Sequence, residues 1–184
     1  PADVSARIQI VNHRIETARQ YPSPHASPRT DVEISLIVLH CISLPAGHFG
    51  GRYVEELFMG TLSGHAHQDF SDLPAARVSA HLFIRRCGAV LQFVTFDQCA
   101  WHAGVSSYQG QQGCNDFSVG IELEGTDTVP YSEIQYEVLG SVVSALQAQY
   151  QIPTSAVVGH SDIAPGRKTD PGPSFDWEKF WCCA

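Results

Sequence analysis

The sequence predicts a mixed α/β fold in which a central mixed β-sheet is flanked by helices. Three observations favour this class: short apolar runs recur along the chain, a hairpin pattern lies in its middle, and one long amphipathic segment follows. The 184 residues, 43% of them hydrophobic and 16% charged, suit one domain covering residues 1–184 with a sizeable core.

The first third of the chain predicts a loop, a strand and a short helix. Residues 1–31 are polar and end in the proline-rich YPSPHASPRTD, so we expect a segment that wraps the surface. The apolar, β-branched VEISLIVLH, residues 32–40, predicts a buried strand that ends at His40. Proline and glycine in ISLPAGHFGG indicate a long loop, and YVEELFMGTL favours a short helix.

The remaining elements follow from their patterns. SAHLFIRRCGAVLQFVTF, residues 79–96, predicts two strands joined by a tight turn at Cys87-Gly88. SVGIELEG, residues 118–125, alternates apolar and polar residues as a strand does. A helix is expected over residues 132–150, because Ser132 and Gln135 fit a capping box and apolar residues follow on one face. The short run AVVGH predicts a last strand, ending at His160.

Charge and composition limit the partners. The chain has a net charge of −8 and so lacks the excess of basic residues that nucleic-acid or anionic-membrane binding needs; we expect neither partner. No apolar run approaches the roughly 18 residues of a membrane span, and no leader-like segment opens the sequence. The six cysteines form no C-x-x-C pair and are expected to be free thiols, which fit a reducing compartment. We therefore expect a cytoplasmic monomer.

Two histidines stand out because each closes a predicted strand. Strand ends of α/β sheets open into the crevice where ligands bind, so His40 and His160 are candidate metal ligands. A catalytic zinc site needs a third protein ligand, and Asp170 in the stiff segment DPGP is the natural candidate. The alternative, that DPGP is only a turn capped by Asp170, has equal weight on spacing alone.

Other polar residues leave two interpretations open. Glu122 and Glu124 share one face of their strand, either as solvated surface groups or with one of them facing a cleft as a base. Arg167 and Lys168 can both be exposed cations, and Lys168 can alternatively stabilise an oxyanion. Among the remaining histidines we expect a core role for His81, a cleft or loop-capping role for His102, and surface or turn roles for His13, His25 and His48. His65 and His67 form an H-x-H pair, a spacing that metal ligands can have, but their polar, loop-like segment offers no obvious third ligand, so a metal role is disfavoured.

Five segments, in order along the chain, carry a resemblance to a known family. VLHCISLPAGHFG, ARVSAHLFIRRCGAVLQFV, AWHAGVSSYQG, CNDFSVGIELEGTD and GHSDIAPGRKTDPGPSFDW together resemble the zinc-dependent N-acetylmuramoyl-L-alanine amidases, a family related to the peptidoglycan recognition proteins. The resemblance extends from about residue 8 to about residue 181. It is greatest to the amidases of cell-wall recycling, which hydrolyse 1,6-anhydromuropeptides.

The resemblance implies a fold, a cofactor, a substrate and site residues. It implies a sheet with Zn²⁺ in a surface groove, held by His40, His160 and Asp170, and a muropeptide as substrate. The family's catalytic glutamate maps to Glu122, as general base, and its active-site lysine to Lys168. It also implies substrate contacts for two residues of motifs that border the groove, Arg77 and Trp101.

One departure and two rival functions remain. The resemblance implies Asn after the first histidine, where this chain has Cys41, and a thiol cannot reproduce the hydrogen bonds of an amide. We expect Cys41 to stay outside the metal shell and to affect substrate affinity or orientation.

A non-catalytic peptidoglycan-binding module would lack one zinc ligand, whereas all three are present here. An exported amidase acting on polymeric peptidoglycan is the other alternative.

Overall fold

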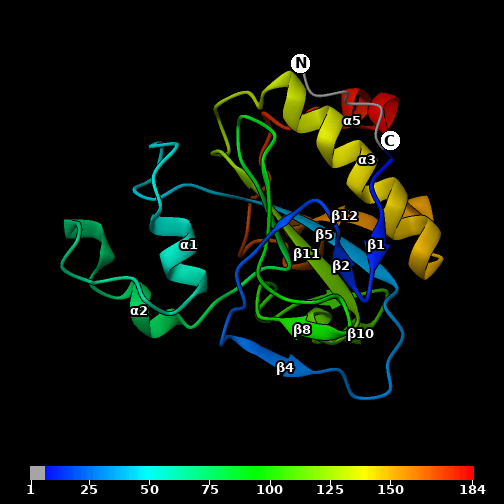
Figure 1. Ribbon diagram of the computed structural model, residues 1–184, viewed down its shortest axis with the longest axis horizontal. Helices are drawn as coiled ribbons and strands as arrows, with labels where there is room; N and C mark the ends of the chain where they lie inside the picture. The colour runs from blue at the N-terminus through cyan, green and yellow to red at the C-terminus, as the bar shows by residue number, and fades with distance from the viewer. Residues whose placement is uncertain (1–6) are drawn as a thin grey trace.

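The computed structural model describes residues 7–184, and its centre is a mixed six-stranded sheet (Figure 1). Four neighbouring strands are parallel, the next is antiparallel to them, and the last is parallel to its neighbour. The order across the sheet is β12 (Val157–Gly159), β5 (Leu36–Ile42), β11 (Ser118–Glu124), β6 (Leu82–Ile84), β7 (Val90–Gln92) and β3 (Arg19–Gln20). This arrangement confirms the predicted fold class.

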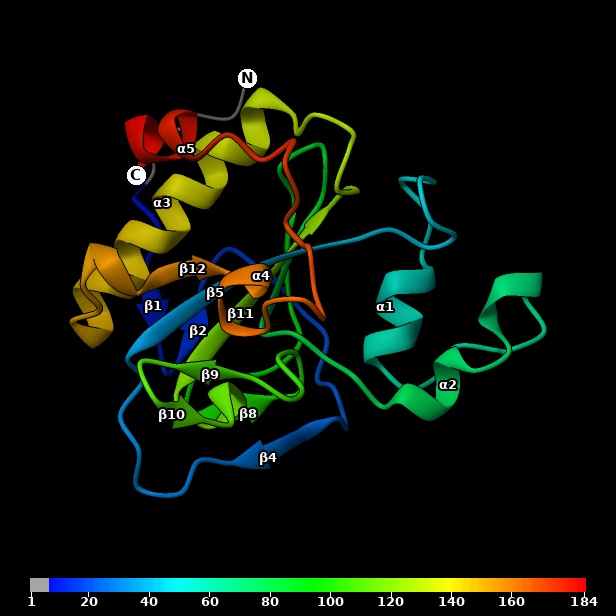
Figure 2. The same cartoon turned by 180° about the vertical axis from the view of Figure 1, so that it is seen from behind.

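Helices and small sheets cover the central sheet. The long helix α3 (Glu133–Tyr150) lies along one side with α5 (Trp177–Cys183), while the pair β4 (Ala26–Pro28) and β8 (Gln98–Ala100) lies on the other side (Figure 2). The remaining elements are β1 (Ile10–Val11), β2 (Arg14–Ile15), β9 (Ser107–Tyr108), β10 (Gln111–Gln112), α1 (Tyr53–Phe58), α2 (Leu73–Ala76), α4 (His160–Ile163) and three 3₁₀ turns, η1 (Gln68–Phe70), η2 (Cys114–Asp116) and η3 (Thr154–Ala156).

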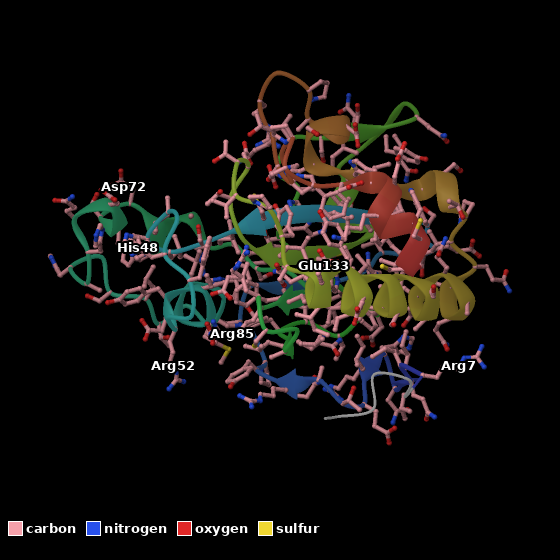
Figure 3. All side chains as sticks on the ribbon, turned by 90° about the horizontal axis from the view of Figure 1, so that it is seen from above. Arg7, His48, Arg52, Asp72, Arg85 and Glu133 are labelled. Atoms are coloured by element: carbon pink, nitrogen blue, oxygen red, sulfur yellow. The ribbon has the colours of Figure 1, made fainter. Side chains whose placement is uncertain are left out.

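One segment projects from the sheet. Helices α1 and α2, with the loops around them, form an arm to one side of the sheet body, where His48, Arg52 and Asp72 are labelled in Figure 3. The arm packs on the sheet body through a second hydrophobic cluster, in which Phe58 and Phe70 are buried together with Phe83 of β6 and Leu91 of β7. No helix within residues 7–184 is long and apolar enough to cross a membrane.

Several predicted elements are confirmed. The Ser132 hydroxyl accepts a hydrogen bond from the Gln135 N–H, and the Gln135 side chain accepts one from the Ser132 N–H, so the capping box starts α3 as expected. The predicted hairpin is the pair β6–β7, and Gly88 in its turn has a φ of +86°, which suits glycine. All six cysteines are free thiols.

The N-terminal segment differs from the predicted loop. Its first six residues lie outside the described part, but the following residues form four short strands, and β3 adds an edge to the main sheet. Ile15 is fully buried in the main core, and His25, expected at the surface, is only 6% exposed. These strands are too short to leave a periodic pattern. β1 and β2 pair with each other, whereas β3 and β4 pair with the distant strands β7 and β8.

Candidate metal and catalytic site

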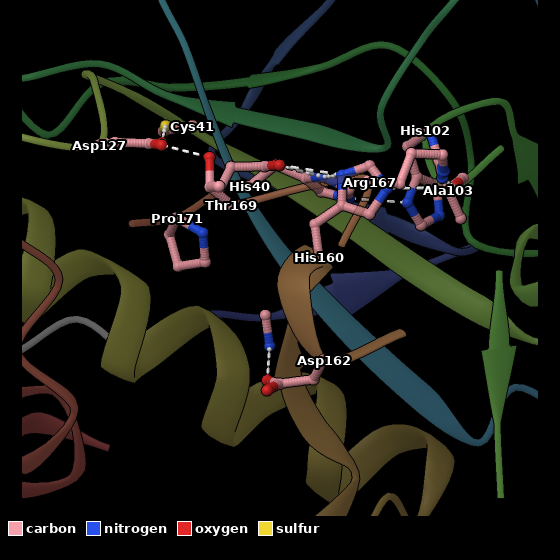
Figure 4. A network of polar contacts seen from close by, with 12 residues as sticks. His40, Cys41, His102, Ala103, Asp127, His160, Asp162, Arg167, Thr169 and Pro171 are labelled. Carbon is pink, nitrogen blue, oxygen red and sulfur yellow. Dashed lines mark hydrogen bonds and ion pairs between the residues drawn. The ribbon is translucent and has the colours of Figure 1, made fainter. Parts of the chain in front are cut away.

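Three side chains from distant parts of the chain meet at one point. His40 Nδ1 lies 3.0 Å from His160 Nδ1 and 3.0 Å from Asp170 Oδ2, and His160 Nδ1 lies 3.1 Å from the same oxygen. These atoms form the one group among residues 7–184 with the spacing of a three-ligand metal site. Figure 4 shows the His40 and His160 rings side by side.

Backbone structure places each of the three. His40 lies within β5, two residues before its end, rather than at the end as predicted. His160 follows β12 directly and is the first residue of α4. Asp170 lies in the loop after α4, and its carbonyl accepts a hydrogen bond from the Ser161 N–H. Since β12 and β5 are parallel neighbours, the two histidines reach the same edge of the sheet.

The protonation of these groups fits a divalent metal. His160 Nε2 lies 3.0 Å from the Ala103 carbonyl, which only accepts, so Nε2 holds the proton and Nδ1 keeps a lone pair. That lone pair faces Asp170. Burial would raise the pKa of the Asp170 carboxyl group, but the adjacent His160 and His40 imidazoles lower it overall, so Asp170 is a carboxylate. Burial lowers the pKa of His40, which favours its neutral, ligating form. Two imidazoles and a carboxylate are a donor set typical of zinc.

Glu122 faces the same pocket from the next strand. It is the register partner of His40 across the parallel pair β5–β11, and both residues line a pocket of about 500 Å³. The residue is only partly buried, but its Oε2 is fully buried and has no hydrogen-bond partner within the described chain. Burial, and next the charge of Asp170, raise the pKa of Glu122 well above its ordinary value. An unpartnered carboxylate of raised pKa is suited to proton transfer.

The other predicted site residues fall in different places. Lys168 and Trp101 line the pocket, as does Arg167. Arg77 does not: it is exposed and follows α2 in a left-handed backbone conformation, one residue before the pocket residue Val78. The substrate contact predicted for Arg77 stays a prediction.

Two acidic residues near the cluster have structural partners. Asp162 accepts a hydrogen bond from the Gly159 N–H at 2.7 Å and so holds the start of α4. Asp127 also lines the pocket and accepts hydrogen bonds from Thr169 and from the Cys41 thiol, the latter at 3.5 Å. Burial raises the pKa of the Cys41 thiol, and its sulfur is not part of the ligand cluster.

The remaining histidines have separate environments. His81 is a satisfied core histidine as predicted, since it accepts from the Gly120 N–H and contacts the Gln98 carbonyl through Nε2. His67 caps the turn η1 through Nδ1, and neither His65 nor His67 belongs to the ligand cluster. His102, left open between a cleft and a loop-capping role, lines the pocket and contacts His40.

Fold and site together define a class: a mixed α/β protein with a two-histidine, one-carboxylate candidate metal site and a neighbouring glutamate. The profile of the N-acetylmuramoyl-L-alanine amidase family matches residues 30–173. The 1,6-anhydro-N-acetylmuramyl-L-alanine amidase AmpD of Citrobacter freundii is 56% identical over 164 residues, which are 89% of this chain and 88% of that protein. The chain therefore belongs to the N-acetylmuramoyl-L-alanine amidase family.

Solved structures agree with this assignment. A crystal structure of a selenomethionine AmpD derivative superposes with a TM-score of 0.94 at 50% identity, covering 96% of this chain and 99% of that one. The amidase AmiD of Escherichia coli, solved in complex with the substrate anhydro-N-acetylmuramic acid-L-Ala-D-γ-Glu-L-Lys, gives a TM-score of 0.58 at 29% identity. The match covers 86% of this chain and 58% of AmiD.

Proposed function

We propose that this protein is a zinc-dependent amidase that hydrolyses the bond between N-acetylmuramic acid and L-alanine in 1,6-anhydromuropeptides, a step of peptidoglycan recycling. The single observation that carries the proposal is the convergence of His40, His160 and Asp170 in a pocket that also contains the unpartnered carboxylate of Glu122. The activity named for the Citrobacter freundii relative and the muropeptide bound to AmiD support this choice of substrate.

Each residue has a proposed role in the reaction. His40, His160 and Asp170 hold Zn²⁺, which when bound supplies Lewis-acid polarisation and water activation. Glu122 accepts the proton of the attacking water and then delivers a proton to the departing α-amine of L-alanine. Lys168 stabilises the negative charge that develops on the carbonyl oxygen. Trp101 offers a flat apolar wall of the pocket for the substrate.

Cellular location and assembly are further parts of the proposal. We place the protein in the cytoplasm, because the released muropeptide would be its substrate and because its free thiols suit a reducing compartment. We also propose that it is a monomer. Hydrolysis assays that compare purified anhydromuropeptides with intact sacculi separate this assignment from an exported enzyme. Faster release of peptide from sacculi than from anhydromuropeptides would contradict the recycling role.

The general-base role is tested with Glu122→Gln. This change keeps the size of the side chain but removes its basicity, so turnover should fall about 10²- to 10⁴-fold while zinc content is retained. Mass spectrometry of the released peptide measures turnover, and elemental analysis measures zinc. The exposed Glu137→Gln serves as the control. Turnover by Glu122→Gln close to that of this control would remove Glu122 from the mechanism.

A further inference from the structure

The segment His102–Ala103, which follows β8, contacts both imidazoles of the candidate metal site. His40 Nε2 lies 2.8 Å from His102 Nδ1, and His160 Nε2 lies 3.0 Å from the Ala103 carbonyl oxygen (Figure 4). In each histidine the contact uses the nitrogen that faces away from the ligand cluster. Two consecutive residues therefore contact both candidate ligands on the side of each ring that faces away from the ligand cluster.

These contacts select which nitrogen of each ring is free to bind a metal. The Ala103 carbonyl can only accept, so His160 carries its proton on Nε2. On the other ring, His40 Nε2 contacts His102 Nδ1, and His102 Nε2 lies 3.0 Å from the Ser118 hydroxyl, so a His40 that binds metal through Nδ1 can donate its Nε2–H to His102, which in turn donates to Ser118. Both Nδ1 atoms are then left with lone pairs directed at the metal position. Partners of this kind, on the far nitrogen of a ligating histidine, fix ring orientation and raise metal affinity.

The segment is itself held by one side chain. Asn115 Oδ1 accepts hydrogen bonds from both backbone N–H groups, that of His102 at 3.1 Å and that of Ala103 at 2.8 Å. Arg167 donates to the same Ala103 carbonyl that His160 uses, at 2.7 Å. The opposite wall is shaped to receive the His102 ring, because a Cβ on Gly120 would lie 2.4 Å from its Cγ. The position of the segment is thus fixed from several directions.

We infer that His102 and Asn115 are positioning residues: they orient His40 and His160 for metal binding without being metal ligands themselves. This inference rests on the proposed metal site. Asn115 is the more informative of the two, since its side chain acts on the ligands only through the His102–Ala103 backbone. The role of Asn115 has no signature in residue spacing, because it depends on where η2 meets the loop after β8.

The test compares Asn115→Leu with Asn115→Asp. Leucine removes the acceptor at similar size, whereas aspartate retains an oxygen for both N–H groups. Zn²⁺ affinity is measured by competition with a chromophoric chelator, and the ligand field is read from the visible absorption bands of the Co²⁺ form. Asn115→Leu should bind Zn²⁺ about 10- to 100-fold more weakly with altered Co²⁺ bands, and Asn115→Asp should recover most of the affinity.

Gln135→Leu is the matched control for stability. It also removes a side chain that bonds two buried backbone groups, the carbonyls of Ile84 and Glu124, but at the start of α3. It should therefore lower the thermal stability and leave Zn²⁺ affinity unchanged. Native affinity and Co²⁺ bands in Asn115→Leu, or equal weakening in the leucine and aspartate variants, would overturn the inference. A wild-type protein that retains no Zn²⁺ would instead overturn the proposed metal site itself.

A second pair of variants applies if Asn115→Leu does not fold. His102→Asn retains an acceptor near the position of Nδ1, and His102→Ala removes it. The inference requires His102→Ala to lose Zn²⁺ affinity by the larger factor. Equal Zn²⁺ affinities in the two variants would contradict it.

Discussion

Glu122 and Glu124 show how two carboxylates on one strand acquire different roles. The Glu124 carboxylate is 6% exposed and accepts hydrogen bonds from the N–H groups of Gly50 and Arg86 and from the Arg85 guanidinium. Glu122 has an oxygen with no partner, beside the candidate metal ligands. Their common face followed from β-strand alternation, but their difference depends on loops that the strand pattern does not describe.

Lys168 gives a prediction at the residue scale. If it stabilises the oxyanion, Lys168→Ala should lower kcat about 100-fold or more and leave KM nearly unchanged. Steady-state kinetics on an anhydromuropeptide measure both constants. Lys168→Arg keeps the positive charge and should retain more activity than the alanine variant. An increase in KM at constant kcat would make Lys168 a substrate-binding residue instead.

His81 makes stability depend on pH. Burial, and next the charge of Arg29, lower its pKa from 6.5 to about 3, so the folded protein holds it neutral. The unfolded chain binds a proton at this histidine below about pH 6.5, so its contribution is present above that pH and is lost as pH falls toward 3. Between pH 7 and pH 5 the free energy of unfolding should fall by about 2 kcal/mol from this residue.

His81→Asn isolates this effect. Asparagine has an acceptor for the Gly120 N–H but does not titrate. Urea unfolding of both proteins at the two pH values gives the comparison, in which the variant is less stable at neutral pH but has the weaker pH dependence. Identical slopes in the two proteins would show that His81 does not contribute to the acid sensitivity.

At the scale of elements, the loop from Ala164 to Gly172 fixes the third candidate ligand. Arg167 and Lys168 donate backbone hydrogen bonds to the Ala164 carbonyl, and the Pro171 carbonyl accepts one from the Tyr131 hydroxyl at 2.7 Å. Gly172 has a φ of +86°, and a Cβ there would lie 2.3 Å from the Asp127 Cα. The loop therefore closes tightly against the residues after β11.

Gly172→Ala should disturb this closure. The added methyl group cannot be accommodated without displacing the chain beside Asp170, so Zn²⁺ affinity should fall together with stability. Gly166→Ala is the matched control in the same loop, since its φ is +76° but a Cβ there meets no atom within 4 Å. Chelator competition and thermal unfolding measure both effects. Equal effects of the two substitutions would show that backbone strain alone is responsible.

Long elements with local sequence signals were predicted more accurately than short elements without them. The helix α3 was predicted almost residue for residue, because its capping box and apolar face are local properties. The hairpin β6–β7 was predicted from its turn. The two-residue strands near the N-terminus were missed, because they are too short to leave a periodic pattern. The strand β3 in addition forms only through pairing with residues about 70 positions away, such as Arg19 with Leu91.

At the scale of the whole molecule, metal binding should couple distant segments. His40 and Asp170 are 130 residues apart in sequence, so an ion held by both stabilises the folded state and has no comparable site in the unfolded chain. With free Zn²⁺ at about 100 times Kd, the gain is about 2.7 kcal/mol. This corresponds to a rise in Tm of roughly 5–10 °C for a chain of this size.

Asp170→Asn should lose most of this rise. Thermal unfolding in Zn²⁺ and in chelator measures the difference for each protein. Asp176→Asn is the control, because Asp176 caps α5 and accepts from the Lys179 N–H away from the site. A full zinc-dependent rise in Asp170→Asn would remove Asp170 from the proposed ligand set.

The sequence by itself determined the class of fold, the main strands, the long helix and the family, because local periodicity and motif order carry that information. It also proposed His40, His160, Asp170 and Glu122, but left Asp170 and Glu122 each with a structural alternative. Only the tertiary structure decided that the first three meet within about 3 Å and that the fourth lacks a partner beside them. It alone revealed Asn115 behind the site, since contacts between distant segments depend on how strands and loops pack and not on residue spacing.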